Sequence, residues 1–274
     1  MRTPVPIAAA ALAAAITALG VGALTPAFAQ NPEEDAGILN EVFKGRPVED
    51  GNGLIAIDMP ARAEDAAIVP VTMRSMLAPG DARAVRAFTL IIDQNPAPVA
   101  ATFALGKQAG VASIATRVRV EGYTNVHAVA ELSDGRLYAV KTFVKASGGC
   151  SAPALKTADD AQAHVGELKF RRFASSDEET GPHEAQIMVR HPNHSGMQMD
   201  PQSRLYVPAL FVRTLKVWQG DALVLSMDGG ISISENPSIR FSYRPNGAKS
   251  FRAEAVDTND RVFRGEWPAD EPRM

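Results

Sequence analysis

The sequence predicts an all-β fold, arranged as two antiparallel β-sandwich domains joined by a linker. Many short runs are rich in β-branched and aromatic residues, and clusters of Gly, Asn, Asp and Pro separate them at regular intervals. Within residues 116–120 (TRVRV), polar and apolar side chains alternate, which is typical of a strand with one buried face. Short, evenly spaced strands with few helices between them favour an antiparallel sandwich.

Residues 1–29 are predicted to be an export signal that is removed from the mature chain. Arg2 is their only charge, an apolar run follows, and the small-x-small tripeptide of residues 27–29 precedes Gln30. A membrane anchor is the alternative, but no basic cluster follows the apolar run. No later segment is apolar for long enough to span a bilayer, so we expect no membrane association after cleavage.

The first domain is predicted to span residues 30–150. A short amphipathic helix opens it, capped by Asp35 and ended near Gly45. The strand that contains Pro70 is expected at a sheet edge, because proline donates no ladder hydrogen bond. Six strand-like runs follow the helix, at residues 68–73, 87–92, 99–105, 113–120, 126–132 and 137–144.

Residues 151–182 are predicted to be a linker, and residues 183–274 a second domain. The linker range is compatible with a helix up to Phe170 and then becomes small and acidic. Each domain has about a hundred residues, which is enough for its own core. The strand-like runs of the second domain lie at residues 185–189, 209–218, 223–227, 239–243, 251–256 and 262–267.

Charge argues against nucleic acid as a partner. The formal net charge of the whole chain is −3. Loss of residues 1–29 removes one positive charge, which leaves −4, and no basic stripe interleaved with aromatic residues is present.

Cys150 is the only cysteine. In an exported protein, an unpaired cysteine indicates an intermolecular bond, for example in a thiol-linked dimer, or a reactive thiol. A buried, inert cysteine is the alternative, but every residue of 146–152 is small. Gly148 and Gly149 widen the backbone conformations open to this segment. As an extended arm it would project the sulfur about 15 Å from the sheet. We therefore expect an exposed thiol.

The reactivity of this thiol depends on its ionised fraction. Lys145 and Lys156 lie near it in sequence and would favour the thiolate, and His164 is the nearest candidate base. The alternative interpretation is an ordinary loop in which the cysteine is incidental.

A second cluster, His191-Pro192-Asn193-His194 with Met197 and Met199, has the ligand types that copper prefers. Its proline and the following Gly196 favour a loop after a strand instead, and we expect no metal. No glycine-rich loop links a strand to a helix, so no nucleotide or other cofactor is expected.

Several of these segments resemble the sulfur-oxidation proteins SoxY and SoxZ, and the chain is similar to the fused SoxYZ-like carriers associated with quinoprotein dehydrogenases. The resemblance to SoxY is carried by residues 68–71 (IVPV), 92–96 (IDQNP), 116–120 (TRVRV) and Gly148-Gly149-Cys150. The resemblance to SoxZ is carried by His191-Pro192 and by residues 206–209 (YVPA) and 233–241 (ISENPSIRF).

The resemblance implies immunoglobulin-like sandwiches and a periplasmic carrier that is not itself an enzyme. Cys150 would attach sulfur intermediates covalently, with Gly148 and Gly149 as its arm. The partners would be periplasmic sulfur-oxidising enzymes or a quinoprotein dehydrogenase. The alternative is an interaction module that assists such a dehydrogenase, with Cys150 dispensable. In SoxY the arm ends the chain, whereas Ser151 continues here, so an arm tethered on both sides reaches less far.

Overall fold

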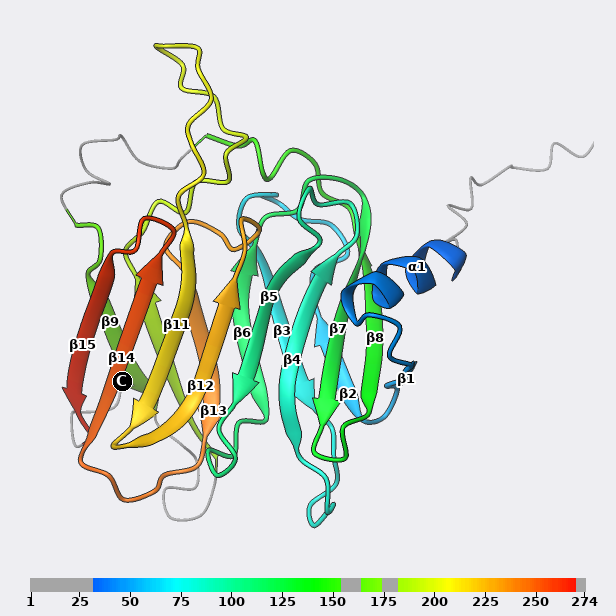
Figure 1. Ribbon diagram of the computed structural model, residues 1–274, viewed down its shortest axis with the longest axis vertical. Coiled ribbons are helices and arrows are strands. Elements are labelled where there is room, and N and C mark those ends of the chain that lie inside the picture. Colours follow the sequence, from blue (N-terminus) through cyan, green and yellow to red (C-terminus); the bar gives the residue numbers. More distant parts are fainter. Residues whose placement is uncertain (1–31, 154–163, 174–181, 270–274) are drawn as a thin grey trace, which may run out of the picture.

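The computed structural model describes residues 32–153, 164–173 and 182–269, so the predicted signal lies outside the described residues. One helix, α1 (Pro32–Val42), precedes a series of strands in two sheets (Figure 1). The prediction of an all-β sandwich fold is confirmed. Among the described residues, no helix has the length and apolar character to cross a membrane.

The larger sheet has nine strands, and its first pair is parallel while the others are antiparallel. In spatial order they are β1 (Val48–Asp50), β8 (Leu137–Val144), β7 (Thr124–Leu132), β4 (Val85–Ile92), β5 (Val99–Leu105), β12 (Ala222–Gly229), β11 (Val212–Gln219), β14 (Ser250–Asp257) and β15 (Val262–Pro268). Helix α1 packs on its outer face, where the apolar side chains of Leu39 and Val42 cover Ile91 and Val129.

The smaller sheet has six strands, all antiparallel to their neighbours. In spatial order they are β2 (Ile55–Asp58), β3 (Val69–Ser75), β6 (Ser113–Val118), β13 (Ser238–Tyr243), β10 (His183–Val189) and β9 (Leu168–Phe173). The prediction that the Pro70 strand lies at a sheet edge is wrong, because β3 lies between β2 and β6, although β2 pairs only with residues 72–75 of it. Pro70 lies beyond that pairing, so its missing N–H removes no bond to β2.

Both sheets run through both halves of the chain. Strand β5 pairs with β12, with Phe103 opposite Met227, and β6 pairs with β13, with Ile114 opposite Phe241. We call these two pairings the seam. Each half thereby covers sheet edges of the other, and such edges otherwise present unpaired N–H and C=O groups.

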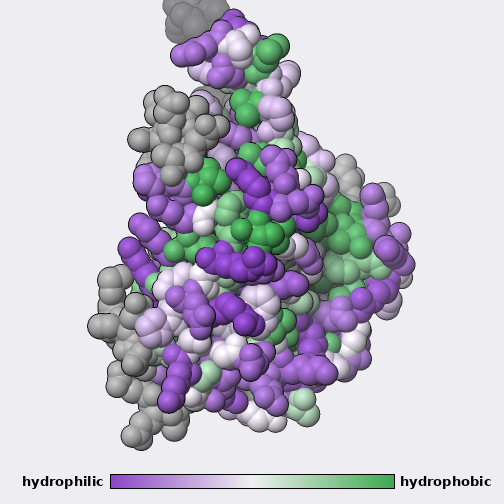
Figure 2. All heavy atoms as spheres, turned by 60° about the vertical axis from the view of Figure 1, so that its left-hand side comes forward, coloured by the Kyte–Doolittle hydropathy of each residue, from purple (hydrophilic) through white to green (hydrophobic). Residues whose placement is uncertain are grey.

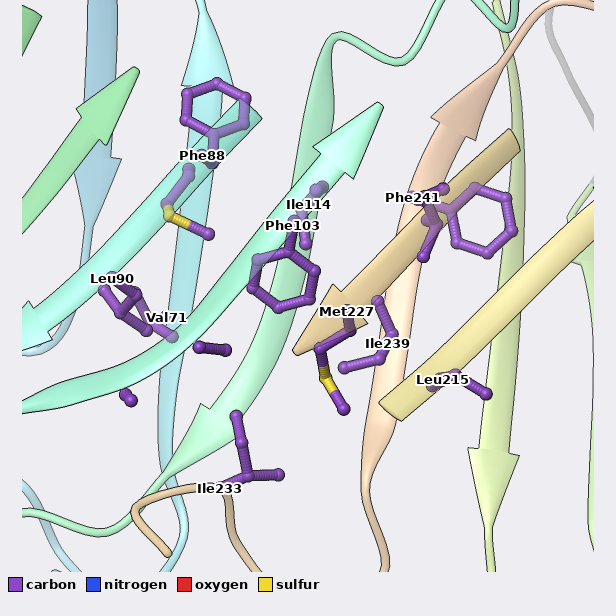
Figure 3. Close-up of a cluster of buried hydrophobic side chains, with 14 of the residues drawn as sticks. Val71, Phe88, Leu90, Phe103, Ile114, Leu215, Met227, Ile233, Ile239 and Phe241 are labelled. Carbon is purple, nitrogen blue, oxygen red and sulfur yellow. The ribbon is translucent and has the colours of Figure 1, made fainter. Parts of the chain in front are cut away.

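A continuous apolar core fills the space between the two sheets on both sides of the seam (Figure 3). Phe88 and Val71 come from the first half, Leu215 and Ile239 from the second, and Phe103 lies between them with no exposed surface. The two predicted domains thus share their sheets and their core.

The range predicted as a linker contributes a strand. The stretch compatible with a helix up to Phe170 is instead extended from Leu168, because β9 pairs with β10 along residues 168–173. Phe170 also stacks on Trp267, at 5.3 Å between ring centroids, and packs on Phe251. Phe251 and Trp267 lie far from Phe170 in sequence, so local propensity did not indicate these aromatic contacts.

Candidate functional site

The segment after β8 crosses one end of the sandwich, from the first half towards the base of a projecting hairpin of the second (Figure 1). Gly148 N donates to Glu121 O at 2.8 Å, and Gly149 N donates to Val120 O at 3.1 Å. A Cβ added at Gly149 would lie 2.1 Å from Ala66 O. Only glycine fits this approach, so the Gly-Gly pair allows the arm to lie flat on residues 120–121.

Cys150 is fully buried in this position, with 0% of its surface exposed. Its amide donates to the Glu121 Oε2 atom at 2.8 Å, and its carbonyl accepts a hydrogen bond from the Ser195 hydroxyl. The expectation of an exposed, projecting thiol is therefore wrong for this structure. Both halves hold the tethered arm down. The thiol nevertheless lies outside the two apolar clusters, among polar groups.

Burial raises the pKa of the Cys150 thiol to about 12, and the nearby charge of Glu121 adds to this effect. Arg119 acts in the opposite direction, and a hydrogen bond between the thiol and Glu121 further favours the neutral form. At neutral pH the group is a thiol. The expected thiolate is thus not formed in the closed position.

The expected neighbours of the thiol do not reach it within the described residues. Lys145 is exposed and is not among the groups that perturb the thiol, and Lys156 lies outside the described residues. His164, the candidate base, has its Nδ1 atom 2.7 Å from Glu167 Oε1 at an exposed position. The charges that act on Cys150 are those of Glu121 and Arg119.

Arg119 is the largest of the fully buried side chains, at 2% exposure. Its Nη1 atom donates to Ile233 O at 2.6 Å, and the charge of Glu235 helps to stabilise the cation. Burial lowers its pKa, while Cys150 and Glu235 raise it. Its Nε atom has no hydrogen-bond partner among the described residues.

Asn95 fixes the backbone on which this site is built. Its Nδ2 atom donates to Arg119 O and to Ser232 Oγ, both at 2.8 Å, and its Oδ1 atom accepts from Glu121 N at 2.8 Å. The amide therefore joins the residues on either side of Val120 to the second half.

The second half contributes His194 beside Arg119 and Glu235. Burial lowers the pKa of His194, and the charge of Arg119 lowers it further, although a hydrogen bond to Gln198 opposes this. The imidazole is therefore neutral at physiological pH. His194 and Glu235 extend the polar cluster around the arm.

His191 does not share a site with His194. Its Nδ1 atom lies 2.9 Å from Asn193 Oδ1, and its Nε2 atom lies 3.4 Å from Asp257 Oδ2. Burial lowers its pKa. Both ring nitrogens thus serve a buried network that supports the loop. Across the three described ranges, no cluster of three or more His, Cys, Asp or Glu side chains has a metal-binding arrangement.

Sequence reasoning missed Arg119, Glu121 and Glu235. The alternation in residues 116–120 predicted that Arg119 lies on the solvent face, but β6 ends at Val118, and Arg119 is buried where its amide donates to Ser232 O. Glu235 lies in the SoxZ-like motif at residues 233–241, where it received no role. The only available signal was that Arg119 and Glu235 lie within resemblance motifs, and Glu121 directly follows residues 116–120.

Two family models match successive parts of the chain. The family model described as sulfur oxidation protein SoxY matches residues 39–150, so its match ends at Cys150. The family model described as sulphur oxidation protein SoxZ matches residues 171–268, and the two together cover most of the chain. No curated protein matches it.

Two solved structures are similar to parts of this chain. The sulfur carrier protein SoxY from Chlorobium limicola f thiosulfatophilum is 23% identical over 42% of this chain and 97% of its own, with a TM-score of 0.33. A superoxide reductase (neelaredoxin) from Ignicoccus hospitalis is 11% identical over 35% of this chain and 82% of its own, with a TM-score of 0.30. On its two successive family matches, the chain belongs to the SoxY and SoxZ families as a fused SoxYZ-like protein.

Proposed function

We propose that this protein is a periplasmic carrier that binds sulfur intermediates covalently through Cys150 and presents them to partner oxidising enzymes. The observation that carries the proposal is the position of Cys150. It is the only cysteine, it ends the SoxY match, and it lies where charged and polar groups of both halves converge. The chemistry of oxidation would belong to the partners.

Loading requires that Cys150 leave its closed position. A thiol with no exposed surface and a pKa of about 12 is neither accessible nor ionised at neutral pH. The hydrogen bonds that hold Cys150 itself are those of its amide and its thiol to Glu121 and of its carbonyl to Ser195. A partner that competes for these groups would release the arm, and the thiol pKa would then fall towards the value of a free cysteine, about 8.5.

Intact mass spectrometry of the protein from its native periplasm tests the proposal. We expect sulfur adducts that are confined to Cys150, and their loss in a Cys150→Ser variant together with the dependent oxidation. A Ser151→Ala variant, changed at the neighbouring exposed residue, is the control and should keep the adducts. Free thiol alone, in cells that are oxidising sulfur compounds, contradicts the proposal.

The burial of Cys150 favours a second candidate, an interaction module that assists a periplasmic quinoprotein dehydrogenase without using the thiol. In this case the cysteine would only complete the packing of the arm. Co-purification with the dehydrogenase, and dehydrogenase activity, would both survive Cys150→Ser. Loss of activity with binding retained would instead support the carrier.

The periplasmic location is tested separately. We expect the mature protein to begin at Gln30 and to appear in the periplasmic fraction. An N-terminal peptide from residues 1–29 in the mature protein, or retention in the cytoplasm, would contradict this part of the proposal.

A further inference from the structure

We propose that Arg119 is the positioning residue for the anionic end of the group carried on Cys150. This inference rests on the proposed carrier function for the presence of a sulfur group, and it adds the side chain that receives this group. The group would be a sulfur oxoanion, with a terminal sulfonate as the end that the guanidinium contacts.

The first support is the position of the guanidinium. Arg119 directly precedes the two residues on which the arm lies, since Val120 O and Glu121 O accept the amides of Gly149 and Gly148. The Arg119 and Cys150 side chains also interact electrostatically, each shifting the pKa of the other. The cation is therefore near enough for its charge to act on the sulfur, and the backbone bonds of the arm place both residues in the same cluster.

The second support is an unused donor. Arg119 is 2% exposed, and its Nε atom has no hydrogen-bond partner among the described residues. Buried polar groups are nearly always paired, and an exception calls for an explanation. An anion with several acceptor oxygens supplies the partner that this donor lacks, because guanidinium N–H groups match such oxygens in charge and geometry.

The third support is the contrast with Glu121. Its carboxylate bonds to the neutral thiol but repels a negative group at the same place. The empty carrier thus closes on Glu121, whereas a loaded carrier turns its anionic end towards Arg119. Glu121 thus stabilises the empty state of the arm, and Arg119 stabilises the loaded state.

The loaded state can be made without partner enzymes. The Cys150 thiolate attacks a central sulfur of tetrathionate, a new S–S bond forms to the cysteine, and thiosulfate leaves with the electron pair of the broken S–S bond. The product is a cysteine that bears an –S–SO₃⁻ group, and the thiol proton goes to solvent. No other oxidant is needed.

The experiment compares full-length wild-type protein with Arg119→Met, Arg119→Lys and Glu121→Gln. Arg117→Met is the matched control, because Arg117 lies on the same segment and its Nη2 atom also donates across to the second half, to Asn236 O at 3.0 Å. The first readout is the ratio of alkylation rates of Cys150 by anionic iodoacetate and neutral iodoacetamide. Both reagents need the same open arm and the same thiolate, so the ratio isolates attraction of the anion.

We expect this ratio to fall about fivefold or more in Arg119→Met, through loss of one nearby positive charge. It should rise in Glu121→Gln and stay within about twofold of wild type in Arg117→Met. Arg119→Lys keeps the charge and should keep the ratio, but it lacks the planar fork. The second readout is the rate at which dithiothreitol removes the tetrathionate adduct, and this rate should increase in both Arg119 variants.

Each outcome separates the two proposals. If tetrathionate loads neither wild-type Cys150 nor Cys150 in Gly149→Ala, whose added Cβ would force the arm to lift, the carrier function fails. If wild type loads but both Arg119 variants match it in ratio and adduct lifetime, the role of Arg119 alone is overturned. An equal change in Arg117→Met would also overturn it, since the effect would then be general loosening. Should Arg119→Met not fold, as circular dichroism would show, the adduct lifetime in Arg119→Lys decides.

Discussion

The two halves of the chain meet at the seam and at the cysteine end, and the two contacts differ in kind. At the seam, backbone ladders join β5 to β12 and β6 to β13, and fully buried apolar side chains such as Phe103 and Met227 lie beneath them. At the cysteine end, the halves are joined by hydrogen bonds of Asn95, Arg119 and Ser195 around a buried thiol. The apolar packing at the seam does not depend on the protonation of any side chain, whereas the polar contacts at the cysteine end do.

The two contacts should therefore respond differently when a group changes its charge. The backbone ladders and buried apolar side chains of the seam do not titrate, so we expect them to hold the halves together when the charge at the cysteine end changes. The cysteine end contains a thiol, two carboxylates, a guanidinium and an imidazole in mutual electrostatic contact. Figure 2 shows that hydrophilic side chains cover most of one outer face, interrupted by apolar patches, so charge on its own does not mark a site. The site is marked instead by a charged side chain that is buried, namely Arg119.

The largest expected effect is at the seam. Phe103→Ala removes a ring with no exposed surface that lies opposite Met227, and should lower the free energy of unfolding by about 3–5 kcal/mol. Urea denaturation measures this. The exposed Leu205 is the control, and Leu205→Ala should change it by less than about 0.5 kcal/mol. Equal losses in the two variants would contradict a continuous core across the seam.

Asn95→Ala should have the next largest effect, about 2–3 kcal/mol. The change removes the donor for Arg119 O and Ser232 Oγ and the acceptor for Glu121 N, and so leaves buried groups unpaired. Unlike Phe103→Ala, it should also speed alkylation of Cys150, because it loosens the residues under the arm. Asn52→Ala, at an exposed turn, is the control. A loss of stability with an unchanged alkylation rate would show that Asn95 does not help to hold the arm closed.

Gly149→Ala should act on the arm with a smaller cost to the fold. The added Cβ would lie 2.1 Å from Ala66 O and 2.7 Å from Val120 O, so the arm must lift. We expect iodoacetamide to label Cys150 about tenfold faster or more at pH 8, since an opened thiol regains its ordinary pKa. Gly37→Ala, where nothing lies within 4 Å of the new Cβ, should label as wild type does. Unchanged labelling in Gly149→Ala would show that the glycine does not hold the thiol closed.

Much of the fold could be predicted from the local sequence pattern. Most strands show either alternating polar and apolar residues or a continuous apolar run. The runs at residues 99–105 and 137–144 coincide with β5 and β8. Strands β1, β2 and β9 were missed, because β1 and β2 have only three and four residues and β9 carries three basic residues among six. The shared sheets were missed because β5 and β12 lie far apart in sequence, and pairing across the seam leaves no signal in either strand alone.

The assignment of Cys150 as the site residue stays a prediction, whereas the expected open state of its thiol is wrong. The small residues around Cys150 indicated an open thiol, yet small residues also permit the closest packing, as Gly149 against Ala66 O shows. Which of these two consequences holds depends on whether other segments cover the arm, and Ser195 and Glu121 do so from positions far away in sequence. The raised pKa of the thiol follows from that cover.

The smallest effect at neutral pH, and the one with the sharpest pH dependence, concerns the thiol itself. The pKa of Cys150 is raised in the folded protein from 9.0 to about 12, so folding favours the protonated form. Below about pH 9 the thiol is neutral in both the folded and unfolded states and adds no pH dependence. Between about pH 9 and 12 the unfolded state loses the proton first, so stability falls as the pH rises.

Cys150→Ser keeps every other titrating group and lacks this loss. The difference in unfolding free energy between the two proteins, measured in urea at pH 7, 9 and 10.5, should therefore stay constant up to about pH 9 and then shift against wild type. A constant difference throughout would mean that the thiol ionises in its closed position, and the contrast between a permanent seam and a charge-sensitive cysteine end would lose its main support.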